Sequence, residues 1–402
     1  MPEQPSPDVS APVYLDNAAT SFPKPDAVYD AVDAYLRHNG AAIGRGTHSA
    51  SDAASRMVEQ CRQRIARILD AESSDRIAFT FNCTDSLNLL LRGIINRGDR
   101  VVTTKLEHNS VLRPLHQLRN EADVDVVHVE FDRATGLVDV DEIASELQRR
   151  PTRLVVLNHA SNVTGVVQPV AEVAEVTHQH GALLLLDAAQ TVGHLPFSVR
   201  DLKVDVLAAA GHKGLLGPLG TGILYVRPGL EDKIRAVRSG GTGTSSESID
   251  QPSTMPTKFE SGNMNAPGLA GLNAATEWLL CEGIDKLHDQ AAFQTTRLVA
   301  ALANISGVTV FGHDNNATPA SNTGIVSFTI VNLDSREAAT ILEQSFNVHC
   351  RAGLHCAPLV HNVLGTRESG GTLRFSVGPF TRDDQIDSAI TAVQQIAASF
   401  MV

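Results

Sequence analysis

The sequence predicts an α/β protein with a large domain built on a mostly parallel sheet flanked by helices, followed by a smaller α+β domain. Strand-like apolar runs alternate with helical patterns from about residue 56 to about residue 226, which is typical of βαβ units. From residue 307 the pattern becomes a shorter series of strand, helix and strand. The length of 402 residues is sufficient for two domains.

In the first part of the chain, residues with helical spacing predict helices over 55–69 and 86–95. Short apolar runs predict buried strands, because an unbroken apolar run suits a sheet that is covered on both faces. These strands are expected at 76–81, 100–104, 124–131, 153–158, 182–187, 204–209 and 222–226.

The second part of the chain begins with a segment of low periodicity. Residues 239–256 are rich in Gly, Ser and Thr and predict a long loop, after which a helix is expected over 266–281. Strands are expected at 308–311, 323–330 and 373–376, with helices at 335–344 and 383–400. We therefore expect a disordered lead-in at 1–12, a large domain over 13–262 whose first residues can pack with the small domain, and a small α+β domain over 263–402.

Composition excludes several classes of protein. The formal net charge of −12 argues against nucleic-acid binding, and no apolar stretch reaches the roughly 18–20 residues needed to span a bilayer. The proline-rich N-terminus lacks the basic and apolar regions of a signal peptide. Five cysteines without CxxC spacing predict free thiols in a cytoplasmic protein, with neither a disulfide framework nor a metal site.

Two polar residues at the ends of successive strands predict a cofactor site. Asp187 ends the run 182–187, and Lys213 lies in a Gly-rich segment just beyond the run 204–209. In open α/β sheets, ligands bind outside the carboxyl ends of the strands. Pyridoxal phosphate (PLP) enzymes need a lysine imine and an acid for the pyridinium nitrogen. Taken singly, Lys213 fits a surface turn and Asp187 fits a helix N-cap.

Further polar residues follow the other strands. The segment 80–86 runs from a strand into a helix, where free N–H groups and the hydroxyl of Thr84 suit a phosphate. Either Thr84 or Asp85 could instead cap the helix without binding a phosphate. After the next strand, His108 is positioned to stack on an aromatic cofactor. Asn162 is positioned to bond a phenolic oxygen, or to form a turn.

The second domain contains a candidate nucleophile and a candidate carboxylate clamp. Cys356 lies in a Gly- and Pro-flanked loop, where the basic neighbours Arg351 and His355 would favour the reactive thiolate. Arg374 interrupts an apolar strand, where its guanidinium could grip a carboxylate bidentately. The structural alternatives are an inert buried thiol for Cys356 and a salt bridge for Arg374.

The other four cysteines divide into two groups. Cys61 and Cys281 lie within or at the end of helical patterns and are expected to be inert and buried. Cys83, beside the phosphate segment, and Cys350, at a strand end, are outside candidates for a reactive thiol.

The sequence resembles the class V (fold type I) PLP-dependent aminotransferase family, and within it the cysteine desulfurase and selenocysteine lyase branch. The resemblance covers nearly the whole chain. It rests on ordered motifs at residues 14–20, 45–48, 84–86, 107–109, 161–165, 187–190, 211–213 and 259–262, and on the Arg-x-Gly-x-His-Cys-Ala segment ending at Ala357. The short segment around Cys356 is similar to that of the group II desulfurases.

The resemblance implies a role for each site residue. Lys213 would hold PLP covalently and later move the Cα proton, and Asp187 would keep the pyridine nitrogen protonated. The remaining cofactor contacts would be Gln190 and Asn162 on the phenolic oxygen, His108 on the ring, and Thr84, Asp85 and His212 on the phosphate. The substrate contacts would be Arg374, Asn162, Ala18 and His48.

The resemblance also implies an activity. Cys356 would take sulfur from L-cysteine as a persulfide and release L-alanine, in a homodimer that passes the sulfur to an acceptor protein. The alternatives are a selenocysteine lyase, a class V aminotransferase or epimerase in which Cys356 has no role, and a sulfur-relay module in which PLP is only structural.

Three positions depart from the family pattern. Ala210 stands where group II members have a serine, Asn263 where the partner subunit contributes a threonine, and Leu354 where some members have a second histidine. Because of these departures, the motifs do not assign the chain firmly to one subgroup and do not identify the sulfur acceptor.

Overall fold

The computed structural model describes residues 12–196, 198–244, 246–312 and 322–401. The predicted lead-in therefore lies outside the described residues, apart from Pro12. Within the described residues, no helix is long and apolar enough to cross a membrane.

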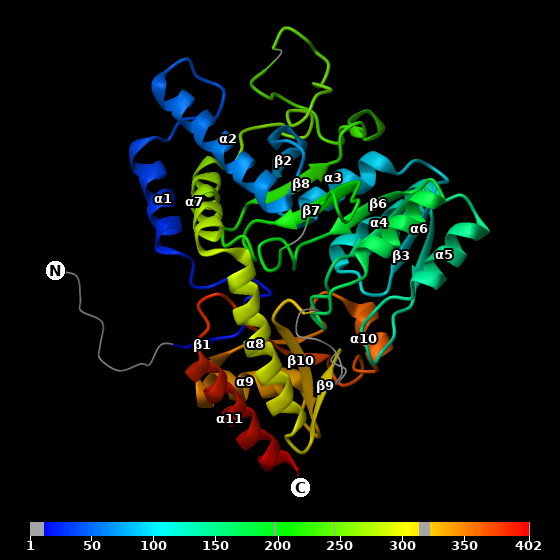
Figure 1. Ribbon diagram of the computed structural model, residues 1–402, viewed down its shortest axis with the longest axis vertical. Helices are drawn as coiled ribbons and strands as arrows, with labels where there is room; N and C mark the ends of the chain where they lie inside the picture. The colour runs from blue at the N-terminus through cyan, green and yellow to red at the C-terminus, as the bar shows by residue number, and fades with distance from the viewer. Residues whose placement is uncertain (1–11, 197, 245, 313–321, 402) are drawn as a thin grey trace, which may run out of the picture.

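A seven-stranded sheet forms the centre of the large domain (Figure 1). Its order is β2 (Ile77–Thr80), β8 (Gly222–Val226), β7 (Val206–Ala210), β6 (Leu183–Asp187), β5 (Leu154–Asn158), β3 (Arg100–Thr104) and β4 (Asp125–Val129). All neighbours from β7 to β4 are parallel, whereas β8 runs antiparallel to both β2 and β7. The predicted mostly parallel sheet is confirmed.

Helices cover both faces of this sheet, so alternate residues of its strands enter different cores. In β6, Leu184 and Leu186 join one core, and Leu183 and Leu185 join the other. The first core is covered by α2 (Ser49–Leu69), α5 (Val140–Arg149), α6 (Val170–Gln179) and α7 (Ala266–Glu282). The second is covered by α3 (Cys83–Ile94) and α4 (Asn109–Ala122). Burial on both faces explains why the strands are apolar throughout.

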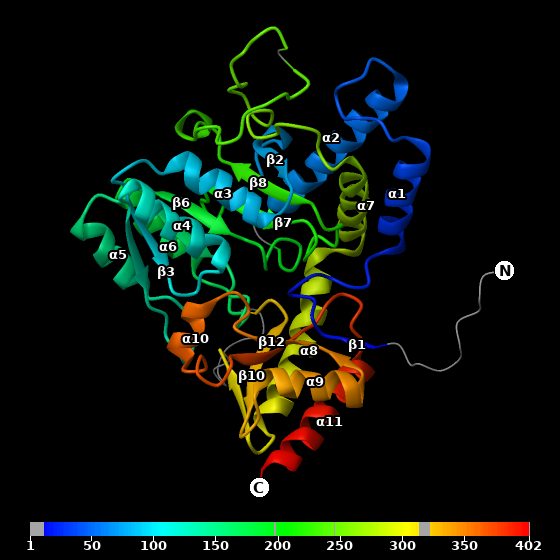
Figure 2. The same ribbon diagram turned by 180° about the vertical axis from the view of Figure 1, so that it is seen from behind.

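The small domain is built on a four-stranded antiparallel sheet (Figure 2). Its order is β12 (Arg351–Gly353), β13 (Thr372–Ser376), β10 (Ile325–Ile330) and β9 (Val308–Phe311). The helices of this domain are α8 (Ile284–Ala303), α9 (Ser335–Phe346), α10 (Pro358–Leu364) and α11 (Asp383–Phe400). Apolar residues of α8, α9 and α11 share one core with the sheet.

The first described residues of the chain pack with the small domain. β1 (Val13–Tyr14) pairs in parallel with β11 (Val348–His349), and Leu15 belongs to the core of the small domain. The chain then crosses to α1 (Asp26–His38) in the large domain. This crossing brings residues 16–21 to the junction between the two sheets.

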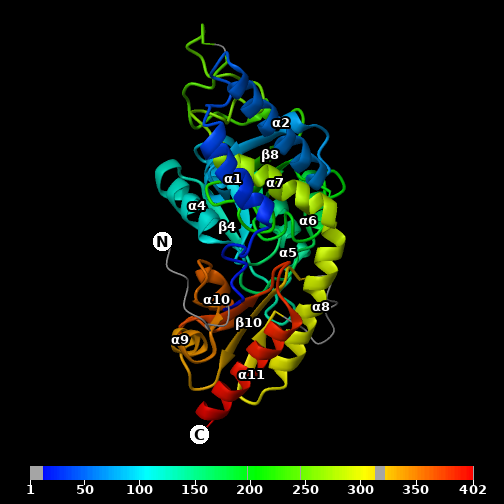
Figure 3. The same cartoon turned by 90° about the vertical axis from the view of Figure 1, so that its left-hand side faces the viewer.

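Helix α7 packs with the large domain, although the sequence places residues 263–282 in the small one. It lies against α1 and α2, and its Leu269, Leu272 and Leu279 enter the core of the large domain. Helix α8 then leads from the large domain into the small one (Figure 3). We therefore place the boundary near Gly283, where the packing partners change, rather than at residue 262.

Candidate active site

A cavity of about 220 Å³ lies between the carboxyl ends of the parallel strands and the small domain. Most of the residues predicted for the site line this cavity. They are Ala18, Thr84, His108, Asn162, Asp187, Gln190, His212, Lys213, Cys356 and Arg374. Three of the lining residues, Arg351, Cys356 and Arg374, come from the small domain, so the site requires both domains.

The predicted acid and lysine lie at the ends of adjacent parallel strands. Asp187 is the last residue of β6 and is 3% exposed. Its Oδ1 accepts hydrogen bonds from the Ala189 N–H at 3.0 Å and the Cys83 thiol at 3.5 Å. Burial raises the pKa of Asp187, and the Ala189 N–H and the Lys213 charge oppose this shift. A buried carboxylate of this kind is best stabilised by a cationic partner, such as a protonated pyridine nitrogen.

Lys213 follows β7 by three residues and lies in the same cavity. Burial is the main cause that lowers the pKa of its ammonium, and the nearby Arg374 and Arg351 charges act in the same direction. A lowered pKa increases the fraction of neutral amine, which is the form that attacks an aldehyde. Because the side chain makes no hydrogen bond to any described residue, its amine is available for a ligand.

The turn between β2 and α3 separates two residues that the sequence grouped together. Thr84 lines the cavity, with its Oγ1 2.7 Å from the Ser110 Oγ. Asp85 does not line it, because its carboxylate accepts the Phe81 N–H at 3.1 Å and pairs with Arg238 at 3.2 Å. The structure thus brings Thr84 to the site and turns the Asp85 side chain away from it.

Two neutral histidines line the cavity. The pKa of His108 is lowered to about 4 by burial and then by the Lys213 charge, and its Nδ1 accepts the Ser110 N–H at 3.1 Å. The pKa of His212 is likewise lowered to about 4 by the same two causes. A neutral His108 presents a flat aromatic face, and a neutral His212 still has one N–H for an anion.

Unpartnered buried atoms show that the cavity suits a polar ligand. Gln190 donates from Nε2 to the Ala18 carbonyl at 3.1 Å, and Asn162 donates from Nδ2 to the His355 carbonyl at 2.6 Å. Their side-chain oxygens and the His212 Nδ1 are buried without a hydrogen-bond partner among the described residues. Buried polar atoms are normally satisfied. A phenolic O–H on a bound ring could donate to one of these amide oxygens, and the His212 ring could donate to a phosphate, so the residues fit PLP.

Arg374 is held rigidly at the small-domain wall of the cavity. It lies on β13 and is 1% exposed, with Nη1 donating to the Asn162 carbonyl at 3.0 Å. Its Nη2 donates to the Asp16 carboxylate at 2.8 Å, whereas its buried Nε has no hydrogen-bond partner in the part of the chain that the structure describes. The salt bridge considered as the structural alternative therefore exists, and it leaves donors free for a substrate carboxylate.

Cys356 is an exposed thiol at the cavity. The Nη2 of Arg351 lies 3.7 Å from its Sγ, so a guanidinium adjoins this sulfur. His355 does not act in the same way. Its ring is buried and bonded to Thr372, and burial holds its pKa well below the usual value. The expectation that both neighbours are charged is therefore wrong for His355.

Two further sequence expectations differ from the structure. His48 is exposed and does not line the cavity; its ring accepts the Ser51 N–H at 3.4 Å at the start of α2. Cys281 is exposed at the end of α7, not buried. Cys61 is buried and Cys350 is half-buried, and burial raises the pKa of each to about 12.

Sequence reasoning missed Ser110, which lines the cavity and bridges Thr84 and His108. Cys83, an outside candidate for a reactive thiol, instead donates to Asp187. Burial, followed by the Asp187 charge, raises the pKa of the Cys83 thiol well above its usual value, so this cysteine is a neutral donor and no nucleophile. A signal for Ser110 was available, because it follows His108 by two residues in the same strand-to-helix turn.

The fold and the site together define the class: an α/β enzyme whose acid and lysine, at adjacent strand ends, are suited to PLP. The chain belongs to the class-V aminotransferase family, whose model matches residues 13–388.

Its relatives carry a more specific name. A probable cysteine desulfurase from Methanothermobacter thermautotrophicus is 35% identical over 388 residues, covering 96% of this chain and 94% of the relative. A cysteine desulfurase from Salmonella agona is 30% identical over 392 residues, covering 95% and 93%. The solved apo structure of a cysteine desulfurase from Thermococcus onnurineus NA1 superposes with a TM-score of 0.89 at 30% identity, covering 96% of this chain and 95% of that one. These similarities confirm the resemblance drawn from the motifs.

Proposed function

We propose that this protein is a PLP-dependent cysteine desulfurase that converts L-cysteine to L-alanine and keeps the sulfur on Cys356 as a persulfide. The observation that supports this function is the meeting of Lys213, Asp187, Arg374 and Cys356 at one cavity. The first two residues serve any enzyme of the family. The Cys356 thiol supplies the nucleophile that sulfur transfer requires.

The residues around the cavity would hold PLP at three points. Asp187 would pair with the pyridine nitrogen, Asn162 and Gln190 would bond the phenolic oxygen, and Thr84 and His212 would hold the phosphate, with His108 against the ring. When bound, PLP makes the Cα proton of an amino acid acidic and weakens the bond from Cβ to sulfur. Lys213, with its lowered pKa, is suited to take the Cα proton and return it.

The substrate would lie between Arg374 and Cys356. The free donors of Arg374 would bind the carboxylate, which orients the side chain of L-cysteine toward the thiol. The Cys356 sulfur then bonds the substrate sulfur as the Cβ–S bond breaks, and Cβ gains a proton. The balanced outcome is one L-alanine and one enzyme persulfide for each L-cysteine, with no external oxidant or reductant.

Two substitutions separate the cofactor from the sulfur chemistry. Cys356→Ala is expected to abolish alanine formation from L-cysteine and to keep the visible absorbance of bound PLP, whereas Lys213→Ala is expected to lose that absorbance. Cys281→Ala, at the other exposed thiol, is the matched control and should keep full activity. Alanine release at the original rate by Cys356→Ala would refute the proposed function. Parallel assays with L-selenocysteine and with an amino acid and keto acid pair would identify the alternative activities.

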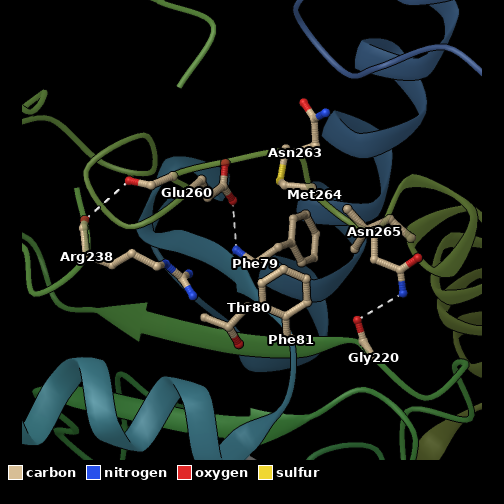
Figure 4. Close-up of a pocket in the computed structure, with 11 residues that line it drawn as sticks. Phe79, Thr80, Phe81, Gly220, Arg238, Glu260, Asn263, Met264 and Asn265 are labelled. Atoms are coloured by element: carbon tan, nitrogen blue, oxygen red, sulfur yellow. Dashed lines mark hydrogen bonds between the residues drawn. The ribbon is translucent and has the colours of Figure 1, made fainter. Parts of the chain in front are cut away.

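We also propose that the protein acts as a homodimer. Beside the turn after β2 lies a second cavity, lined by residues that include Phe79, Phe81, Arg238 and Asn263 (Figure 4). Phe81 and Leu219, in this region, are 45% and 66% exposed, which favours burial against a second copy. Light scattering should give twice the 42.9 kDa chain mass. Leu219→Asp should lower this value, and Val331→Asp on the small domain should not. A monomer in the unmodified protein would refute the proposal.

We further propose that the sulfur passes to an acceptor protein and that the enzyme works in a reducing compartment. The exposed Cys356 thiol can be reached by an acceptor protein, and all five cysteines are free thiols, as in the cytoplasm. Persulfide on Cys356 should disappear when an acceptor thiol is added, as mass spectrometry of its peptide would show. Persistence of the persulfide with every thiol tested would contradict this step.

A further inference from the structure

Cys356 lies in an unusual backbone conformation. His355 and Cys356 are consecutive residues with φ of 48° and 58°, in the left-handed region that residues other than glycine rarely adopt. Two such residues in succession persist only where the surrounding contacts impose them. The conformation of the nucleophile therefore depends on the groups that hold this pair.

The large domain and the loop itself hold the backbone of the pair. From the large domain, Asn162 Nδ2 donates to the His355 carbonyl at 2.6 Å, and the Asn109 N–H donates to the Cys356 carbonyl at 2.7 Å. Within the loop, the Ala357 N–H donates to the Leu354 carbonyl at 2.8 Å. These bonds fix the backbone, but they do not fix the loop to its own domain.

The His355 side chain makes that connection. Its Nε2 lies 3.0 Å from the carbonyl oxygen of Thr372 and 3.0 Å from the Thr372 Oγ1. Because a carbonyl oxygen only accepts, Nε2 must bear the proton. Thr372 lies two residues before Arg374 on β13, so the imidazole anchors the cysteine loop to the strand that bears the proposed substrate clamp.

We propose that His355 is a positioning residue that holds Cys356 in its left-handed conformation by donating from Nε2 to Thr372. The proposal rests on the proposed desulfurase function. His355 fixes the distance between the thiol and the carboxylate site at Arg374, because both groups are tied to one strand. A misplacement of about 1 Å at a reacting group can cost on the order of 100-fold in rate.

The alternative role, a base that deprotonates Cys356, does not fit the geometry. With the proton on Nε2, the basic nitrogen of a neutral ring is Nδ1. Within the described ranges, that atom is buried without any hydrogen-bond partner, and the cation within reach of the Cys356 sulfur is Arg351. His355 is therefore next to the nucleophile in sequence but does not exchange a proton with it.

A matched pair of substitutions tests the proposal in the holoenzyme. The side-chain amide nitrogen of His355→Gln can replace the Nε2 donor but cannot act as a base, whereas His355→Leu has no donor. Persulfide formation on Cys356 should fall on the order of 100-fold in His355→Leu and stay within about fivefold of the original rate in His355→Gln. The spectral change when L-cysteine binds should be unchanged in both variants.

Hydrogen exchange gives a readout that is independent of activity. In His355→Leu the amides of the peptide over 352–364 should exchange at least tenfold faster, and those of α11 should not change. Equal loss of persulfide formation in both variants would overturn the proposal, as would full activity with unchanged exchange in His355→Leu. Failure of the desulfurase function itself would be seen separately, as no alanine from L-cysteine in the unsubstituted enzyme.

Discussion

Arg374→Gln removes the guanidinium that we propose binds the substrate carboxylate. Two of the five N–H groups of Arg374 are committed, one to the Asn162 carbonyl and one to Asp16. Among the residues that the structure describes, the other three donors have no partner, and the buried Nε is one of them. Arg374 can thus make two charge-assisted hydrogen bonds to a carboxylate without breaking its own contacts.

The size of the effect follows from these two bonds. A hydrogen bond to a charged group contributes about 1.5–3 kcal/mol, so losing two costs about 3 kcal/mol or more. Since about 1.4 kcal/mol corresponds to a factor of ten, kcat/KM should fall by at least about 100-fold. The carboxylate keeps its charge throughout the reaction, so the loss should appear mainly as a higher KM.

Alanine formation measured against L-cysteine concentration tests this expectation. Arg374→Lys, which keeps the charge but lacks the planar fork, should lose less than Arg374→Gln. Unchanged absorbance of bound PLP would show that the cofactor site is intact in both variants. A KM within threefold of the original value in Arg374→Gln would refute the assignment of Arg374 as the clamp.

Two further predictions concern stability. Burial lowers the pKa of His361 to about 4. The unfolded chain binds a proton at this residue below about pH 6.5, so the free energy of unfolding should fall as the pH falls from 6.5 to 4. The contribution of this one group is at most about 1.4 kcal/mol per pH unit. Urea unfolding of His361→Gln should show a shallower dependence on pH, and an identical slope would contradict the assignment. Glu260→Gln leaves the buried Arg62 without its 2.8 Å ion pair and should cost about 3 kcal/mol in urea unfolding. Asp33→Asn, in an exposed pair with Arg37, should lower the free energy of unfolding by less than 1 kcal/mol. An equal loss of stability in Glu260→Gln and Asp33→Asn would contradict the argument that burial makes the Arg62–Glu260 pair important.

Much of the large domain could be predicted from the sequence. Runs such as 182–187 are apolar at every position because both faces of the sheet are covered, and the polar residue that ends such a run marks the ligand edge. Asp187 and Lys213 were found in this way, and helix α11 begins and ends at the predicted residues. The domain boundary near Gly283 was not recoverable from the sequence, because the apolar pattern of α7 is the same whichever core it enters.

Side-chain direction in turns could not be predicted. Thr84 and Asp85 are neighbours at the start of α3, but only the first lines the cavity, because Arg238 holds the second on the other side. Similarly, His355 and Cys356 are adjacent, but one is buried and neutral and the other is exposed at the cavity. A local pattern specifies which residues are near a site, and long-range contacts decide which of them face it.

The sequence by itself determined the class of the protein: the alternation of strands and helices, the acid and lysine after successive strands, and the family to which these motifs belong. Only the tertiary structure decided how the chemistry is assembled. Strand β13, the N-terminal segment at Asp16 and the loop at Cys356 are separated by up to 358 residues along the chain, yet they meet at one cavity. The physical reason is that strand periodicity is a local property, whereas the site forms only when the cores of both domains pack and bring their edges together.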